Sequence, residues 1–408
     1  MAPHILSSKE RKAIFAVVSA ALIISIVTEE KVRKRRTRQP TFLRAALARP
    51  SKGRNSTAWR ILLTFGTPRD FIKSTNFPKQ IIVDRILPKF ERVRARFNYG
   101  SPYRKGPKTR GRVPQVDSMD LLGPALWYLK SRCTMYSLCP VFGLVPTTVS
   151  VWLDYALEVL LRVVNKRKHR DFEIRWPTVD EMKLSAELLW KSRPQGHLLR
   201  GVFGVVDGGR MPCAHYVDPE LQNAFFEGFT QNEEVTNLLV FNFFGELIHA
   251  AVNFPGSWHD NRLASASGLY WPKLSDEMTP PGYAILGDSA FVNDTRITNG
   301  KIIRSRKANE AQDIPESAEL CTVDLLLHRI MPSERQSAEW GIRALKGPFA
   351  RLKVPLPADA AKRSRLIRIC CHLLNLRTRF VGLNQIRSTY AGPEALSQPW
   401  SASLEVQT

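Results

Sequence analysis

The chain has 408 residues, of which 44% are hydrophobic, 24% charged and 9% aromatic. This composition is ordinary for a globular protein, and it excludes a chain that is wholly disordered, collagen-like or coiled-coil. The length allows two or three domains. The charge is not ordinary, because 60 Lys and Arg residues against 37 Asp and Glu give a formal net charge of +23.

This charge is concentrated in one part of the chain. Residues 1–115 carry a net charge of +21, whereas residues 116–408 carry only +2. Within the second part, residues 201–300 contain 12 acidic and 4 basic side chains. This distribution favours a region that grips a polyanion, joined to a site built from carboxylates. The alternative is a solvated basic tail on a neutral domain.

The N-terminal 115 residues are expected to form a basic helical and flexible region. Residues 13–27 are apolar throughout but shorter than the roughly 20 residues of a spanning helix. Both a buried helix and a membrane anchor therefore stay open. The basic run 31–38 is typical of a nuclear-import or DNA-contact segment, or else of a solvated linker. The six cysteines form no CxxC pair, which indicates free thiols and argues against zinc.

The clearest linker is residues 98–114, which are rich in Gly and Pro and contain no acidic residue. Such a segment does not pack into a core, but it can lie along a phosphate backbone. Five basic residues of this linker are therefore predicted to contact DNA: Arg104, Lys105, Lys108, Arg110 and Arg112.

Helical patterns fill much of the chain before residue 198. Residues 61–97 are helical in pattern, with breaks expected at Pro68, Pro78 and Pro88. A helix over 121–131, a turn at 141–144 and a helix that continues over 147–164, with Pro146 in its first turn, follow the helix-turn-helix pattern. Any helical bundle produces the same pattern, so it is weak alone. We expect this helix-turn-helix-like, all-α domain to occupy residues 116–197.

Strand patterns begin after residue 200. Apolar runs at 202–206 and 283–287 predict strands, and the runs 235–244 and 247–254 predict a β-hairpin with Gly245-Glu246 as a two-residue turn. Helices are expected over 333–347 and 360–380. Strands followed by helices indicate an α/β domain at 198–390 with a mixed sheet and flanking helices, followed by a flexible tail at 391–408.

Four acidic residues occupy positions from which they can converge. Asp207 and Asp288 end two apolar strands, Asp260 follows the hairpin, and Glu339 lies in a helix that Ser333 is expected to cap. Hard cations such as Mg²⁺ or Mn²⁺ prefer oxygen ligands, and two of them clamp the reacting oxygens of a phosphodiester. The alternatives are that each Asp is a turn residue, and that Glu339 is an exposed salt-bridge partner of Arg343.

The motifs around these acids resemble those of PIF/Harbinger-type transposases, which are DDE superfamily endonucleases. The matching segments, together with a similar C-terminal ending at 382–390, are VVDGG (205–209), NFPGSWHDNRL (253–263), YAILGDSAF (283–291) and RQSAEWGIRALKGPFARL (335–352). The resemblance implies an RNase H-like fold, two divalent ions (Mg²⁺ or Mn²⁺), a DNA substrate in the nucleus and a separate Myb-like partner protein. A homo-oligomer is a further expectation.

Carried over by position, Asp207, Asp288 and Glu339 correspond to the catalytic acidic triad, and Asp260 to a fourth metal-associated acid. The implied reaction is hydrolysis of a phosphodiester at the ends of a DNA element, followed by attack of the freed 3′-OH on target DNA. Three basic residues that share the Glu339 helix are expected to hold phosphates: Arg335, Arg343 and Lys346. His259 is expected to donate a hydrogen bond to a metal ligand, or else to be a buried core histidine.

Some positions depart from the family pattern. Gly208 and Gly209 follow Asp207 where many members have a hydroxyl residue and a histidine, and 51 positions separate Asp288 from Glu339. Glu334 is an alternative to Glu339. These departures keep open a catalytically inactive DNA-binding or adaptor protein derived from a transposase, and the apolar run 13–27 keeps open a membrane-anchored protein.

Overall fold

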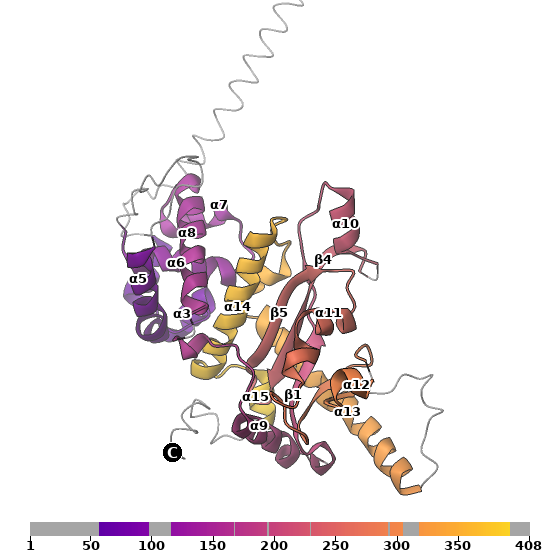
Figure 1. The fold of residues 1–408 in the computed structure, drawn as a ribbon. Helices are drawn as coiled ribbons and strands as arrows, with labels where there is room; N and C mark the ends of the chain where they lie inside the picture. The colour runs from indigo at the N-terminus through magenta and orange to yellow at the C-terminus, as the bar shows by residue number, and fades with distance from the viewer. Residues whose placement is uncertain are drawn as a thin grey trace, which may run out of the picture. The chain divides into compact units, whose positions relative to one another are not determined.

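The computed structural model describes residues 57–97, 116–166, 168–193, 196–228, 230–292, 294–304 and 318–391 (Figure 1). These residues divide into two compact units. The first unit contains the described residues 57–61 and 135–150, and the second contains those of 62–134 and 151–391. The apolar run 13–27, the basic run 31–38 and the whole linker 98–114 lie outside the described residues.

The first unit contains the helix α7, Met135–Phe142, and the start of α8, Pro146–Val164. The rings of Trp59 and Phe142 pack with their centroids 5.4 Å apart. Gly143 follows α7 with a φ of +63°, a left-handed conformation that costs glycine little and ends helices. The predicted turn and the predicted helix after Pro146 are confirmed, although α7 extends into the expected turn.

The second unit begins with a set of helices: α2 (Ala58–Phe65, shared with the first unit), α3 (Pro68–Thr75), α4 (Lys79–Ile81), the π-helical turn η2 (Ile82–Ile86), α5 (Leu87–Arg96) and α6 (Ser118–Lys130). Pro68 begins α3 and Pro78 precedes α4, so two of the predicted breaks are confirmed. The break predicted at Pro88 is wrong. The amide of Leu87 bonds to Ile82 across the π-turn, and Pro88 then occupies the first turn of α5, where its missing amide hydrogen costs little.

A mixed sheet forms the centre of the second unit. Its main strands are β1 (Val202–Gly208), β4 (Asn232–Asn242), β5 (Leu247–Pro255), β6 (Ala284–Gly287) and β7 (Ile302–Arg304). β4 lies between β5 and β1 and is antiparallel to both, whereas β1, β6 and β7 are parallel neighbours. Two short strands pair with β4: β2 (Met211–Pro212) and β3 (Phe226–Glu227). The predicted mixed α/β class is confirmed.

The predicted hairpin is confirmed as β4 and β5, but its two-residue turn is wrong. The turn spans four residues, 243–246, because the side chain of Asn242 accepts a hydrogen bond from the amide of Glu246 at 2.9 Å and ends β4 early. Gly245 has a φ of +80° in this turn, and a Cβ there would lie 2.5 Å from the side chain of Asn384. Glycine is therefore required at position 245 for two reasons.

Helices cover both faces of the sheet. Adjacent side chains of a strand point to opposite faces, and Val240 and Phe241 of β4 show which helices lie there. Val240 belongs to a buried cluster with Leu263 of α11 (Asp260–Ala266). Phe241 contacts Gly341 of α13 (Ala318–Lys346) so closely that a Cβ at position 341 would lie 2.6 Å from the ring. Gly341 therefore lets α13 approach the face on which Phe241 lies.

The two long C-terminal helices were predicted with unequal success. α14 spans Ala360–Phe380, as predicted, and Asn375 on it hydrogen-bonds both backbone groups of Leu247 at the start of β5. α13 ends at Lys346, close to the predicted end, but the start predicted at Ser333 is wrong. The helix begins at Ala318 and continues through Pro332, since one proline removes a single backbone donor and does not always end a helix.

Shorter helices complete the second unit, and the sequence patterns did not predict them: α9 (Val179–Ser192), α10 (Pro219–Phe225), α11, α12 (Thr295–Thr298) and α15 (Gln385–Tyr390). Among the described residues no single helix is long and apolar enough to cross a membrane. The bent pair of α7 and α8 meets that criterion by length and composition only.

Candidate metal centre

Asp207 and Asp288 lie side by side because of the strand register. Val205 of β1 pairs with Leu286 of β6 in parallel, and each aspartate lies two residues further along the chain. Residues two apart point to the same face, so both carboxylates emerge at the same level and on the same side. Val205 also pairs with Phe241, which faces α13, so this is the α13 face of the sheet.

Asp260 reaches the same point from a different element. It is the first residue of α11, five residues after the end of β5. Its Oδ1 occupies space next to Gly208, where a Cβ would lie only 2.3 Å from it. Gly208 therefore makes room for this carboxylate.

The structure brings three of the four predicted acids together. Asp207, Asp260 and Asp288 each offer one carboxylate oxygen, and these three oxygens lie within 4.8 Å of one another in a half-buried position. Among the described residues, no Lys or Arg forms an ion pair with any of them. The cluster therefore gathers three carboxylates without a direct ion-pair partner in the described part of the chain.

The electrostatics of the cluster reflect this arrangement. Burial raises the pKa of Asp207 to about 7, and the nearby charge of Asp260 adds to the rise, whereas the amide of Gly208 and the charge of Arg335 oppose it. Burial and the charge of Asp288 also raise the pKa of Asp260. Three oxygen donors that repel one another in a partly dry site suit a hard divalent cation, which would relieve the repulsion.

Glu339 is not part of this cluster. It lies on α13 with its side chain 42% exposed, and its carboxylate is 3.5 Å from Arg343 and 4.0 Å from Arg335. Both contacts join residues four apart on one helix face. The contact with Arg343 is the salt bridge that the sequence offered as an alternative role for Glu339.

Glu334, the alternative acid, is buried in a separate network. It is 2% exposed, with Oε1 2.8 Å from Nε of Arg193 and Oε2 accepting a hydrogen bond of 2.5 Å from the hydroxyl of Tyr390. Burial, followed by the bond to Glu334, raises the pKa of Tyr390 to about 12. Glu334 thus joins α13 to α15 and does not face the aspartates' cluster as a ligand.

The three basic residues expected on the Glu339 helix have different environments. Arg343 is exposed beside Glu339, and Arg335 is close enough to Asp207 to lower its pKa. The ammonium group of Lys346 donates a hydrogen bond to the carbonyl of Arg210, and burial lowers its pKa. Lys346 therefore holds the segment that follows Asp207.

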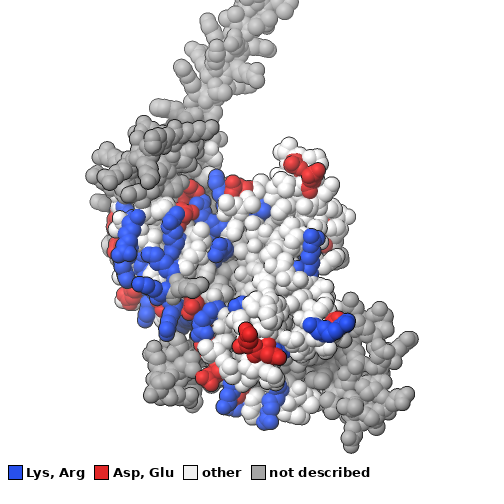
Figure 2. All heavy atoms as spheres, viewed as in Figure 1, with Lys and Arg blue, Asp and Glu red and all other residues white. Residues whose placement is uncertain are grey.

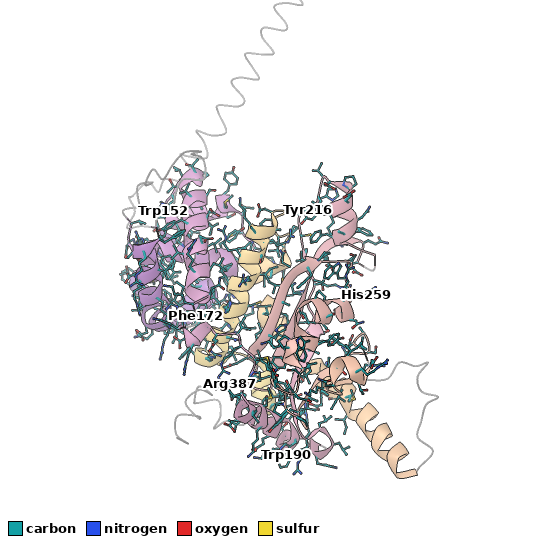
Figure 3. All side chains as sticks on the ribbon, in the orientation of Figure 1. Trp152, Phe172, Trp190, Tyr216, His259 and Arg387 are labelled. Carbon is teal, nitrogen blue, oxygen red and sulfur yellow. The ribbon has the colours of Figure 1, made fainter. Side chains whose placement is uncertain are left out.

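His259 precedes α11 and is exposed, so its interpretation as a buried core histidine is wrong (Figure 3). Burial raises the pKa of Asp260, and Arg210 and then His259 oppose that rise. The five linker residues predicted to contact DNA lie outside the described residues: Arg104, Lys105, Lys108, Arg110 and Arg112.

Basic side chains also gather over the N-terminal helices of the second unit, including α3 and α5 (Figure 2). Arg85, Arg92 and Arg96 are exposed there. The net charge of this region was evident from the sequence, but these residues were not singled out. The spacing of Arg85, Arg92 and Arg96, at 7 and 4 residues, is a signal that could have placed them on one helical face.

Comparison with known proteins gives a similarity to one family. Neither the curated proteins nor the solved structures gave a match to this chain. Residues 206–375 match the family model of the DDE superfamily endonuclease, and this segment contains Asp207, Asp260, Asp288 and Glu339. The part of the chain that carries the aspartate cluster is therefore similar to DDE superfamily endonucleases.

Proposed function

We propose that this protein is a divalent-metal-dependent DNA endonuclease of the transposase type. The observation that carries the proposal is the meeting of Asp207, Asp260 and Asp288 within 4.8 Å, inside the segment that matches the endonuclease family. Three carboxylates from separate elements, with raised pKa values on two of them, form a donor set that fits Mg²⁺ or Mn²⁺.

In this proposal the three aspartates hold the cations, two ions being the number that the reaction class uses. Bound there, the ions would neutralise charge on the phosphodiester and activate the attacking oxygen. Asp207 lies in β1 and Asp288 directly follows β6, so the paired strands position both carboxylates for the orientation that in-line attack needs. Lys346 positions the segment after Asp207 through the carbonyl of Arg210.

Glu339 is proposed as the third catalytic acid and a further ligand, supported by its place in the matched family segment and on the helix that faces Asp207. In this role it would exchange its contacts with Arg335 and Arg343 for the cation. Those two arginines would then be free to hold DNA phosphates. Because both now neutralise Glu339, binding of DNA and binding of metal would support each other.

Several finer features belong to the same proposal. The four motifs favour the PIF/Harbinger type, which carries with it an RNase H-like core, transfer of the 3′-OH to target DNA and a Myb-like partner protein. The helices α6, α7 and α8 occupy the positions of the predicted helix-turn-helix-like region. The basic run 31–38 supports a nuclear location, and a homo-oligomer would bring two DNA ends together.

One observation favours a second function, a DNA-binding or adaptor protein without catalysis. Glu339 is neutralised by two arginines and stands outside the aspartate cluster. If this arrangement persists when DNA and metal are present, the third acid of the triad does not reach the cation. The basic surface and net charge would still support DNA binding.

Nicking of supercoiled plasmid DNA in Mn²⁺ distinguishes the two functions. Wild-type protein is expected to nick, and Asp207→Asn to reduce nicking by at least about 100-fold, because removal of a metal ligand removes charge stabilisation. The matched control is Asp180→Asn, at an exposed position on α9. Salt-sensitive DNA binding by a folded wild-type protein that does not nick, alone or with a candidate partner, would favour the adaptor.

A further inference from the structure

A second charged site includes Arg343, the residue that pairs with Glu339. A cavity of about 380 Å³ is formed where the ends of α6, α13 and α14 meet the segment before α15. Three of the residues that line it are cationic, and none is acidic: Lys130, Arg343 and Arg377. Trp340, Leu383 and Gln385 contribute further walls.

Two of these cations are not neutralised by acidic side chains. Burial lowers the pKa of Lys130, and the charges of Arg377 and Lys353 lower it further. No acidic side chain among the described residues forms an ion pair with Lys130 or Arg377. Lys130, Arg377 and Lys353 therefore form a group of like charges that repel one another.

Arg377, which lines the cavity, also has a buried donor without a partner among the described residues. Its residue is 8% exposed, and burial lowers its pKa. Nη1 donates a hydrogen bond of 2.7 Å to the carbonyl of Leu383, but the buried Nε has no hydrogen-bond partner among the described residues. A buried guanidinium with an unused donor costs free energy unless something accepts that bond.

We propose that this cavity is an anion site that binds a phosphate group. A phosphate accepts several hydrogen bonds at once from guanidinium and ammonium donors, which matches Arg343, Arg377 and Lys130. The expected source is the DNA backbone, and this part of the inference rests on the proposed function. Arg343 lies four residues after Glu339 on α13. A phosphate bound by Arg343 would therefore lie next to the DNA backbone that Glu339 would approach.

The test uses Lys130→Gln in the full-length protein, with Lys183→Gln at an exposed position of α9 as the matched control. Binding of a fluorescein-labelled duplex is measured by anisotropy in EDTA at a series of salt concentrations. Removal of one phosphate contact is expected to lower the slope of log K against log salt by about 0.9 in Lys130→Gln, and not in the control.

A second arm distinguishes DNA from a free anion. Inorganic phosphate and pyrophosphate are titrated while thermal unfolding is followed, and both are expected to raise the Tm of wild-type protein but not of Lys130→Gln. Without any anion, Lys130→Gln is expected to unfold at a Tm equal to or above that of wild type, because repulsion is relieved. This result also shows that the variant folds.

Each outcome has one meaning. A changed salt slope supports the site with DNA as its ligand, whereas phosphate stabilisation with an unchanged slope overturns DNA as the source and keeps a free anion. No difference between Lys130→Gln and wild type in either arm overturns the anion site. Plasmid nicking is scored separately. If the protein nicks DNA but shows no effect of Lys130→Gln in these two arms, only the anion site is contradicted. If the two arms support the anion site but the protein does not nick DNA, only the nuclease activity is contradicted.

Discussion

A side chain at position 208 would occupy the space that the carboxylate of Asp260 fills. Asp260 extends toward β1 from the start of α11, and its Oδ1 comes so close that a Cβ at position 208 would lie 2.3 Å away, which only glycine permits. The requirement concerns the position of a ligand, since Gly208 itself offers no side-chain donor. Such supporting residues affect metal sites nearly as strongly as the ligands do.

Gly208→Ala is therefore expected to weaken Mn²⁺ binding by about 10- to 100-fold, because Asp260 must move out of the cluster. Calorimetric titration with Mn²⁺ measures this. Gly228→Ala is the matched control, since a Cβ at that position meets nothing within 4 Å. Equal affinities of the two variants would show that Asp260 is not a ligand.

The raised pKa of Asp207 predicts how stability depends on pH without metal. The folded-state pKa of about 7 lies above the unfolded value of 3.8, so the folded state binds the proton more tightly. This contribution to stability is fully present below pH 3.8 and is lost as the pH rises through about 7. In EDTA, the wild-type Tm should fall relative to that of Asp207→Asn as the pH rises from about 4 to about 7, and parallel curves would contradict this cause.

On the scale of elements, Glu334 and Glu339 of α13 have opposite expected roles. Glu334 is buried and joins α13 to Arg193 and Tyr390, whereas Glu339 is partly exposed and faces arginines of its own helix. The same helix thus carries a structural carboxylate, Glu334, and a proposed catalytic one, Glu339. The two can be compared with the same substitution.

Glu334→Gln is expected to lower the free energy of unfolding by about 3 kcal/mol, since it removes the charge that pairs with Arg193, while the partial exposure of Arg193 limits the effect. Glu339→Gln should change stability by less than about 0.5 kcal/mol. Urea unfolding measures both. A stable Glu334→Gln protein would contradict the structural role of this network.

The two substitutions, Glu334→Gln and Glu339→Gln, are expected to affect activity in the opposite order to stability. Glu339→Gln is expected to reduce Mn²⁺-dependent nicking by at least about 100-fold, because the third acid is removed. Glu334→Gln should retain nicking within a few-fold at a temperature where it is folded. Full activity of Glu339→Gln would remove Glu339 from the catalytic proposal and leave the three aspartates.

The elements show which features a sequence can predict. Apolar runs predicted β1, the hairpin strands, β6 and α14, because burial imposes a period on the residues. The start of α13 and the continuous helix at Pro88 were missed, since proline was taken as a stop in places where the helix continues. The turn after β4 was missed because a side chain of Asn242 closes it.

The candidate site was predictable in part for similar reasons. Asp207 lies at the end of β1 and Asp288 directly follows β6, and parallel neighbours bring strand ends together. The space at Gly208, the ion pairs of Glu339 and the burial of Glu334 depend on how side chains pack in the folded chain. No spacing rule contains that information.

For the whole molecule, the separation of charge is the main physical feature. A net charge of +21 over residues 1–115 precedes an acidic region that contains the aspartate cluster. A basic region increases the local concentration of DNA near a site that would itself repel phosphates without its cations. DNA binding and cleavage are therefore expected to be separable by mutation.

Replacement of all five basic linker residues by Gln should reduce the salt slope of DNA binding by at most about 4.5, at about 0.9 for each phosphate contact that is removed. The residues are Arg104, Lys105, Lys108, Arg110 and Arg112. Exchange of Arg for Lys and of Lys for Arg at the same positions is the control, since it keeps the charge. A slope unchanged by the Gln variant would show that the linker does not contact DNA.

The most direct test of the metal centre is calorimetric titration of the metal-free protein with Mn²⁺ at about pH 8, above the pKa of about 7 at which Asp207 ionises. Wild-type protein and Asp180→Asn are expected to bind Mn²⁺ with equal affinity, while Asp288→Asn should bind at least about tenfold more weakly because one of the clustered oxygens is removed. Equal binding by all three proteins, or no binding by the wild type, would contradict a cation site formed by Asp207, Asp260 and Asp288.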